Sequence, residues 1–148
     1  MASRRGVQEI VVTLRPHSRE HRGGINALAE GGGLLYSAGR DGICRAWDVA
    51  TPGAPPAHVA SLVGHSDWVN DVLVSGDDLV ITCSSDQTVV LWGGARRNHE
   101  RLWTLNGHAD YIKAIAYSAA THCLVTCSLD QSILLWDLQA AQPAARKR

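Results

Sequence analysis

The sequence predicts an all-β fold in which about three similar units follow one another, each a small four-stranded antiparallel sheet. Three observations lead to this prediction. Histidine, aspartate and tryptophan recur at a nearly constant period, short runs rich in β-branched residues lie between them, and glycine-rich turns separate the runs. Repetition takes precedence over assignments made one segment at a time, because every unit must adopt the same structure.

The period is measured on these three residue types. Gly-His stands at residues 64–65 and 107–108, and Trp-Asp at 47–48 and 136–137. Repeats of roughly 40 to 45 residues that begin and end in this way are typical of β-propeller blades. Two positions depart from the pattern, since Glu20 precedes His21 and Gly93 follows Trp92. Successive histidines are 44 and 43 residues apart, and successive aspartates and tryptophans 45 and 44, counted on His21, His65 and His108, on Asp41, Asp86 and Asp130, and on Trp47, Trp92 and Trp136.

The elements are expected in order along the chain. Residues 1–19 form an N-terminal outer strand at 8–14, belonging to a blade other than the first, and a linker. Residues 20–137 form blades one to three, and 138–148 a polar, basic tail without a fourth strand for blade three. The strands are expected at 25–30, 34–38, 43–48 and 58–62 in blade one, at 68–74, 79–84, 88–92 and 101–105 in blade two, and at 111–117, 123–128 and 132–137 in blade three.

The first strand of each blade carries apolar residues three positions apart rather than in strict alternation. The pairs are Ile25 with Leu28, Val69 with Val72, and Ile112 with Ile115. Apolar groups on both faces predict strands that are buried on both sides, as in radially stacked blades.

Three blades do not close a ring, because propellers typically need about 4 to 8. The sequence therefore predicts an open array with two uncovered blade faces. We expect the chain to be the front part of a longer protein; the alternative is that it completes itself by association.

Composition narrows the classes of partner. The 148 residues include 14 acidic and 14 basic side chains, whereas nucleic-acid or anionic-membrane surfaces usually carry a basic excess. No apolar run approaches 18 residues, and the N-terminus lacks the apolar region of a signal peptide. We expect a cytoplasmic and nuclear protein with protein partners, without membrane or direct nucleic-acid contact and without a cofactor.

The cysteines are predicted to be structural thiols. Cys83 and Cys127 occupy the same repeat position, as small buried side chains would. Cys123 and Cys127 are four residues apart on one strand, which separates them by about 13 Å at ~3.3 Å per residue. One zinc ion cannot bind both at that separation.

Each repeat also contains a histidine, a serine or threonine, an aspartate and a tryptophan, a set named here the tetrad. A hydrolase would need one such nucleophile on a strained turn beside an oxyanion hole. Here the set occurs three times, twice with threonine, which favours a hydrogen-bond ladder that satisfies a buried tryptophan and a buried aspartate. We expect no catalytic residue. The tetrads are His21, Ser37, Asp41 and Trp47; His65, Thr82, Asp86 and Trp92; and His108, Thr126, Asp130 and Trp136.

A candidate protein-binding rim follows from the same geometry. The loop before each first strand and the turn that holds each aspartate should lie at one end of the array. Tryptophan, tyrosine and arginine are frequent interface anchors, although the two aromatic residues could instead cover the blade junctions. The rim candidates are Arg40, Asp67, Trp68, Ser85, Asp110 and Tyr111.

The repeats resemble the WD40 family, and within it the activators of ubiquitin-specific proteases, over about residues 20–138. The resemblance lies in H-S-D-W-V-N-D (65–71), S-S-D-Q-T-V-V-L-W (84–92), H-A-D-Y-I-K-A-I-A-Y (108–117) and S-L-D-Q-S-I-L-L-W-D (128–137). It implies a non-catalytic scaffold that binds and activates a ubiquitin-specific protease, with ubiquitin as a further partner and a link to DNA repair. The alternative it leaves open is an adaptor of another complex, such as a ubiquitin-ligase substrate receptor.

Overall fold

The computed structural model describes residues 21–50, 54–76 and 78–139. The strand predicted at 8–14 and most of the predicted basic tail lie outside these residues. Within them, no helix is long and apolar enough to cross a lipid bilayer.

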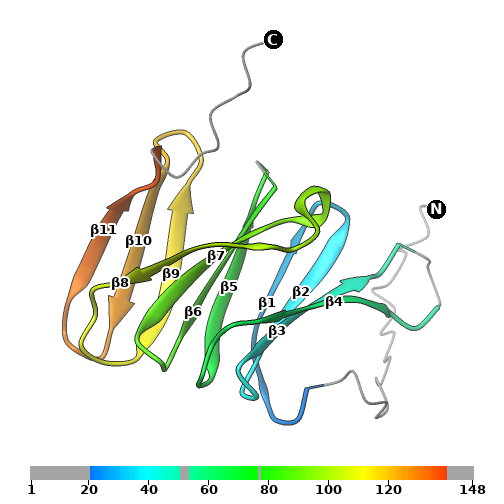
Figure 1. Ribbon diagram of the computed structural model, residues 1–148, viewed down its shortest axis with the longest axis horizontal. Helices are drawn as coiled ribbons and strands as arrows, with labels where there is room; N and C mark the ends of the chain where they lie inside the picture. Colours follow the sequence, from blue (N-terminus) through cyan, green and yellow to red (C-terminus); the bar gives the residue numbers. More distant parts are fainter. Residues whose placement is uncertain (1–20, 51–53, 77, 140–148) are drawn as a thin grey trace, which may run out of the picture.

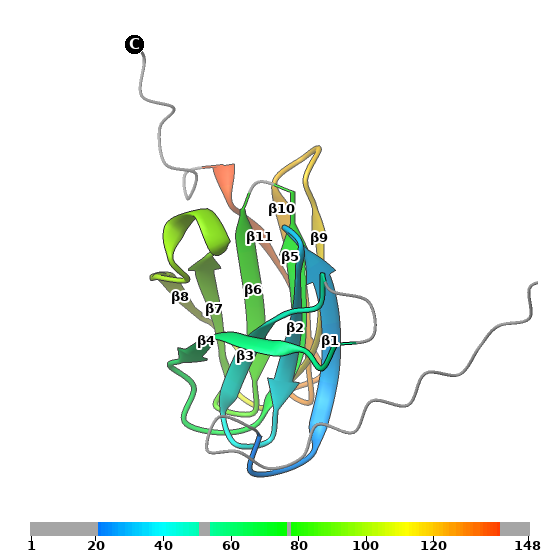
Figure 2. The same cartoon turned by 90° about the vertical axis from the view of Figure 1, so that its right-hand side faces the viewer.

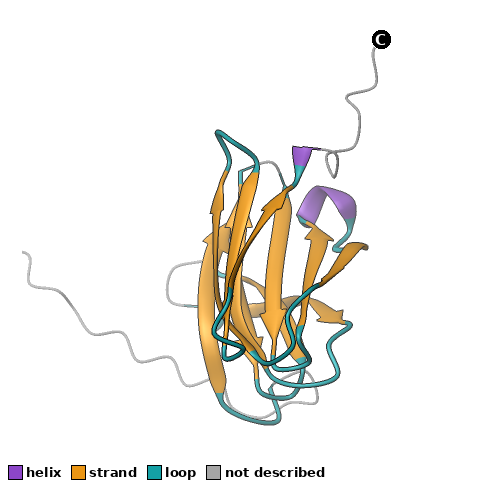
Figure 3. Ribbon diagram, turned by 90° about the vertical axis from the view of Figure 1, so that its left-hand side faces the viewer, coloured by secondary structure: helices purple, strands orange, loops and turns teal. Residues whose placement is uncertain are grey.

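Three antiparallel sheets stand side by side as an open fan (Figure 1), two with four strands and one with three. Strands make up most of the molecule (Figure 3), and a short 3-10 helix, η1 (Ala95–Arg97), separates β7 from β8. The prediction of a partial, unclosed array is confirmed, and the strands lie within a few residues of their expected positions. They are β1 (Ile25–Gly31), β2 (Leu34–Gly39), β3 (Ile43–Asp48), β4 (Ala57–Val63), β5 (Val69–Ser75), β6 (Leu79–Ser84), β7 (Thr88–Gly93), β8 (Arg101–Asn106), β9 (Ile112–Ser118), β10 (Cys123–Ser128) and β11 (Ile133–Asp137).

The strands run in chain order across each blade, from an inner first strand to an outer fourth one. Blade one has the order β1-β2-β3-β4, blade two β5-β6-β7-β8, and blade three β9-β10-β11. Figure 2 shows the inner strands β1 and β9 along one side of the molecule and the outer strands β4 and β8 along the other. The blades meet face to face, so each has a near face toward the preceding blade and a far face toward the next.

The expectation that the inner strands are buried on both faces holds for β5 but not for β1 or β9, and a β-bulge in every inner strand accounts for their apolar spacing. Ile25 pairs with Gly39 and Ala27 with Ala38, which leaves Asn26 as the extra residue. The same shift leaves Asn70 unpaired in β5 and Lys113 in β9. Because one residue is inserted, apolar side chains three positions apart point to the same face. Their spacing therefore marks the near face of each blade, and only the central blade is covered on both sides.

The turn after each tetrad aspartate needs a left-handed residue. Gly42 has a φ of 78°, Gln87 of 69° and Gln131 of 70°. Only blade one has the glycine that the turn geometry prefers. The glutamines take up the same conformation because the aspartate side chain accepts hydrogen bonds across the turn, as described below.

Two apolar cores lie between the three blades. One joins the far face of blade one to the near face of blade two and includes Tyr36, Leu62 and Val80. The other joins the far face of blade two to the near face of blade three and includes Ile81, Leu91 and other side chains such as Leu124. Blade two is thus the central layer, and the outward faces of blades one and three have no cover among the described residues.

Candidate functional site

The tetrad of blade two is a chain of hydrogen bonds that runs from the core to the turn. The Trp92 indole N–H donates to Thr82 Oγ1 over 2.9 Å, and the Thr82 hydroxyl lies 2.8 Å from His65 Nε2. His65 Nδ1 lies 2.9 Å from Asp86 Oδ2. A single order of donors satisfies every group: indole N–H to hydroxyl oxygen, hydroxyl to Nε2, and Nδ1–H to carboxylate.

Blades one and three contain the same chain. Trp47 donates to Ser37 over 2.8 Å, and Trp136 donates to Thr126 over 3.0 Å. The corresponding histidine-to-hydroxyl distances are both 2.7 Å, and the histidine-to-aspartate distances are 2.9 and 2.8 Å. The structure thus brings together all twelve residues that the sequence grouped by spacing.

Each tetrad aspartate accepts further hydrogen bonds from its own turn. Asp86 accepts from the backbone N–H groups of Ser66 (3.1 Å) and Thr88 (2.9 Å), and Asp130 accepts from Ala109 and Ser132 in the same way. These donors tie the loop before the inner strand to the turn after the second strand. The aspartate therefore fixes the shape of one end of its blade.

The pKa of each aspartate reflects this concentration of donors. Burial raises the pKa of Asp41, but the hydrogen bonds from His21, the Arg22 backbone and Arg45 outweigh it and lower the pKa from 3.8 to about 2. Burial also raises the pKa of Asp86, and His65 and Thr88 lower it far below its usual range. At Asp130 the Ser132 hydroxyl is the strongest influence and lowers the pKa in the same direction. All three side chains are carboxylates at neutral pH.

Around its aspartate, blade one differs from the others at two positions that the sequence pattern did not reveal. Blades two and three place a hydroxyl two residues after the aspartate, at Thr88 and Ser132, and each hydroxyl donates to the carboxylate over 2.6 Å. Ile43 occupies that position in blade one. The buried side chain of Arg45 replaces the hydroxyl, with Nη1 2.8 Å from Asp41 Oδ2. In the sequence, the only sign of this difference is a basic residue, Arg45, in the middle of a mainly apolar predicted strand.

The hydroxyls of the tetrads are not placed to act as nucleophiles. Thr82 and Thr126 are fully buried, and Ser37 is 2% exposed although it borders a cavity of about 300 Å³. Each hydroxyl oxygen already accepts the indole N–H of its own blade. A hydrolase nucleophile must instead meet substrate beside an oxyanion hole. The tetrads act as internal bracing.

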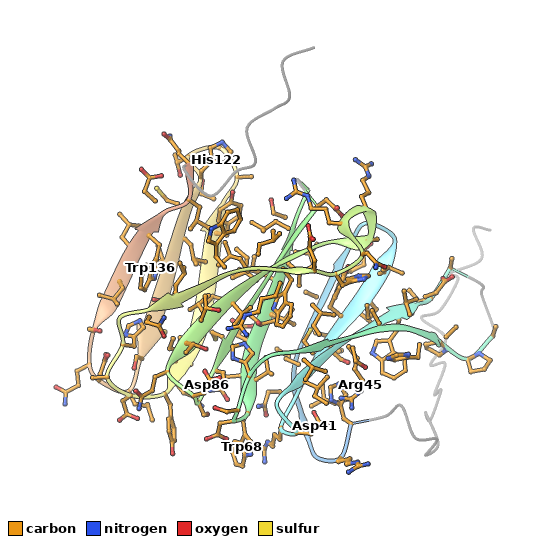
Figure 4. All side chains as sticks on the ribbon, in the orientation of Figure 1. Asp41, Arg45, Trp68, Asp86, His122 and Trp136 are labelled. Carbon is orange, nitrogen blue, oxygen red and sulfur yellow. The ribbon has the colours of Figure 1, made fainter. Side chains whose placement is uncertain are left out.

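The rim lies at the end of the molecule that carries the tetrad turns. Figure 4 shows Asp41, Asp86 and Trp68 at this end and His122 at the opposite end. Trp68 is 46% and Tyr111 44% exposed. Each follows an aspartate whose side chain accepts the aromatic residue's own backbone N–H over 2.7 Å, namely Asp67 and Asp110.

Trp68 is held by a cation from the preceding blade. The guanidinium carbon of Arg40, from blade one, lies 4.7 Å from the ring centroid of Trp68 in blade two. Arg40 also donates through Nε to Asn26 Oδ1 over 2.9 Å. Trp68 thus both covers a blade junction and presents part of its surface to solvent, stacked with a cation.

Ser85 corrects the predicted composition of the rim. It is 6% exposed, and its hydroxyl accepts a hydrogen bond from Asn70 Nδ2 over 3.0 Å. Asn70 also donates to the backbone carbonyl of Ile112 over 2.7 Å. Ser85 therefore belongs to the junction between blades two and three, whereas the other rim candidates remain at the surface.

The four cysteines are free thiols. Burial raises the pKa of Cys44 to about 12 and raises that of Cys83 further. Cys127, at the position equivalent to Cys83, is only partly buried, because the far face of blade three is uncovered. Among the described residues, no group of histidine, cysteine and acidic side chains is arranged to hold a metal ion.

A family model described as WD domain, G-beta repeat (WD40) matches three ranges of the chain, residues 9–48, 57–93 and 99–137. The second range starts at β4 and the third just before β8, the outer strands that pair with β3 and β7. Each of these matched repeats therefore begins with the outer strand of the preceding blade. The first range begins within the strand predicted at 8–14, so that strand occupies the equivalent position in the sequence.

Proposed function

Because the chain belongs to the WD40 family, whose repeats form protein-interaction scaffolds, we propose that it binds a ubiquitin-specific protease through its rim and raises that protease's activity. The chain contributes no catalytic group to the reaction. Its role is to hold the protease in a productive conformation. We place this activity in the cytoplasm and nucleus, with ubiquitin as a further partner and DNA repair as the process it serves.

The observation that carries this proposal is the pair of exposed aromatic residues at equivalent rim positions. Trp68 and Tyr111 present large amphipathic surfaces, and such residues often contribute most of the binding energy at interfaces. Both are pre-ordered, since the preceding aspartate accepts their backbone N–H and their carbonyls accept from Ser85 and Leu129. Little side-chain or backbone freedom is lost when a partner docks on such a surface.

The charges around these aromatics suit a polar partner surface of mixed sign. Asp67 and Asp110 alternate with Trp68 and Tyr111 along the rim, and Arg40 supplies a cation beside them. Rim charges of this kind steer association and set orientation more than they add affinity. The similarity of residues 65–71 and 108–117 to deubiquitinase activators supports the choice of partner class.

The proposal is tested with the full 148-residue chain and a panel of ubiquitin-specific proteases. Binding is measured by pull-down, and activity by release of a fluorophore from the C-terminus of ubiquitin. We expect one protease to bind and to cleave faster in the presence of the chain. The Trp68→Ala, Tyr111→Ala double variant should weaken that binding by roughly 30-fold or more, as expected for two anchor residues.

The matched control is Trp103→Ala, which removes an exposed tryptophan from the outer strand β8 rather than from the rim. It should leave binding and activation unchanged. If no protease binds and no cleavage rate changes, the proposed activation is wrong. Capture of ubiquitin-ligase subunits by the rim, without any effect on deubiquitination, would identify the chain as a substrate-receptor adaptor instead.

A further inference from the structure

The two uncovered faces of the fan have the composition of the two halves of one blade junction. Leu28 on the near face of blade one is 61% exposed, whereas its equivalent in blade two, Val72, is 4% exposed. Leu135 on the far face of blade three is 70% exposed, whereas its equivalent Leu91 is fully buried. We propose that a second copy of this chain closes the ring, with blade three of each copy packed against blade one of the other.

The near face of blade one has a hollow that such packing would fill. A cavity of about 300 Å³ is lined mainly by apolar side chains, among them Ile25, Leu28, Leu35 and Trp47. In blade two the equivalent side chains Val69, Val72, Val80 and Trp92 are buried beneath the far face of blade one. The cavity thus lies on a face that corresponds to one side of a blade junction. The complete form of that junction is the packing of blade one against blade two.

The far face of blade three carries the side chains required on the other half. Val125, Cys127, Ile133 and Leu135 stand at the positions of Ile81, Cys83, Val89 and Leu91, which form the far face of blade two. Ile133 is 73% exposed. Neighbouring exposed apolar side chains such as Ile133 and Leu135 form a surface that soluble proteins normally cover.

A polar contact repeated at both existing junctions sets the register of the third. The bulged residue Asn26 donates to the carbonyl of Val69 over 2.9 Å, and the bulged residue Asn70 donates to the carbonyl of Ile112 over 2.7 Å. In each case the acceptor is the first residue of the next inner strand. Lys113 is the bulged residue of blade three, and its ammonium group can donate hydrogen bonds but cannot accept them. Across the proposed junction it would donate to the Ile25 carbonyl of the other copy.

Two copies give a ring of six blades, within the range of about 4 to 8 that closed propellers contain. The arrangement has twofold symmetry and two identical junctions, so both open faces of both copies are covered and no further copy can add.

The proposal is tested by measuring the mass of the full 148-residue chain in solution by size-exclusion chromatography with light scattering. We expect twice the 15.9 kDa mass of one chain. Leu135→Glu places a charge on the far face and should give a monomer, and Ile25→Glu should do the same from the near face. The matched control, Ala119→Glu, adds the same charge in the exposed turn after β9 and should remain a dimer.

Mixing the two monomeric variants separates a lost interface from a lost fold. A far face from the Ile25→Glu chain and a near face from the Leu135→Glu chain are both unaltered, so one intact junction can form in the mixture. We expect a heterodimer there, which an unfolded variant could not give. A wild-type monomer, a series of larger species, a dimeric Leu135→Glu chain, or no heterodimer in the mixture would each overturn the proposal. None of these outcomes depends on whether a protease binds the rim.

Discussion

At the scale of single residues, the tetrad aspartate concentrates more hydrogen bonds than any other side chain of its blade. Asp86 accepts from a histidine ring, a hydroxyl and two backbone N–H groups. The residues around this aspartate can differ between blades as long as they still donate hydrogen bonds to it. In blade one, Arg45 donates to the aspartate in place of the hydroxyl of the other blades. We therefore expect removal of the aspartate side chain to lower the free energy of unfolding more than removal of any other side chain of its blade.

Replacing Asp86 by alanine should lower the free energy of unfolding by about 2–4 kcal/mol, because it leaves several buried donors without an acceptor. Urea denaturation followed by tryptophan fluorescence measures the change. Asp48→Ala is the control, since Asp48 is exposed and, among the described residues, its side chain accepts only the Ala50 backbone N–H, over 2.8 Å. Equal stability of the two variants would contradict the bracing role.

The lowered aspartate pKa values predict a loss of stability in acid. In the unfolded chain these carboxyls protonate near pH 3.8, whereas in the folded protein Asp41 protonates near pH 2 and Asp86 lower still. The unfolded state therefore binds more protons below pH 4, and stability falls as pH drops from about 4 to about 2. Thermal unfolding at pH 5, 4, 3 and 2.5 measures this.

The variant that isolates this effect is Asp86→Asn, which keeps the shape of the side chain and removes its titration. Its unfolding temperature should be lower than that of the wild type at pH 5 and should depend less on pH below 4. A wild-type unfolding temperature that stays constant from pH 5 to pH 2.5 would show that the tetrad carboxylates are not protonated more readily in the unfolded chain.

At the scale of the strand, the bulge in each inner strand is the feature with the widest consequences. It places apolar residues three apart on one face, and it aims Asn26 and Asn70 at the next blade. The junction between blades one and two also requires β1 and β5 to approach each other closely. Gly31 lies against the side chain of Val74, and a Cβ at residue 31 would overlap it.

Gly31→Ala should therefore destabilise the protein by about 1–3 kcal/mol through overpacking at the junction of blades one and two. Gly76→Ala is the control, because a Cβ there meets no atom within 4 Å. Adding Val74→Ala to Gly31→Ala should cost less than the sum of the two single changes, since the smaller side chain makes room. If Gly31→Ala is as stable as Gly76→Ala, the two strands are not in close contact.

At the scale of the whole molecule, two cores share one central blade and two faces remain open. The cores on either side of blade two bury Val72 and Leu91, whereas their equivalents Leu28 in blade one and Leu135 in blade three are more than half exposed. The open ends are therefore the least stable parts of the fan, and a second copy would convert them into interior.

Strand positions, blade number and tetrad membership follow from the sequence, because they depend on a local pattern repeated three times. Repetition also indicated that the tetrads are structural rather than catalytic, since an enzyme needs one active site and the tetrad occurs in every blade. The expectation of burial on both faces was wrong for β1 and β9, because the apolar spacing of three that a bulge produces looks the same in the sequence as that of a strand buried on both faces.

Only the tertiary structure decided which of the tetrad and rim residues are exposed to solvent and how the blades pack against one another. Burial of Ser85, the contact of Arg45 with Asp41, and the stacking of Arg40 on Trp68 all depend on side-chain positions that spacing does not specify. The junctions join residues more than 40 positions apart, as in the bond from Asn70 to Ile112, so their register appears only when the blades pack. The sequence by itself determined a row of blades, and packing between distant strands determined how those blades meet and what their free faces can bind.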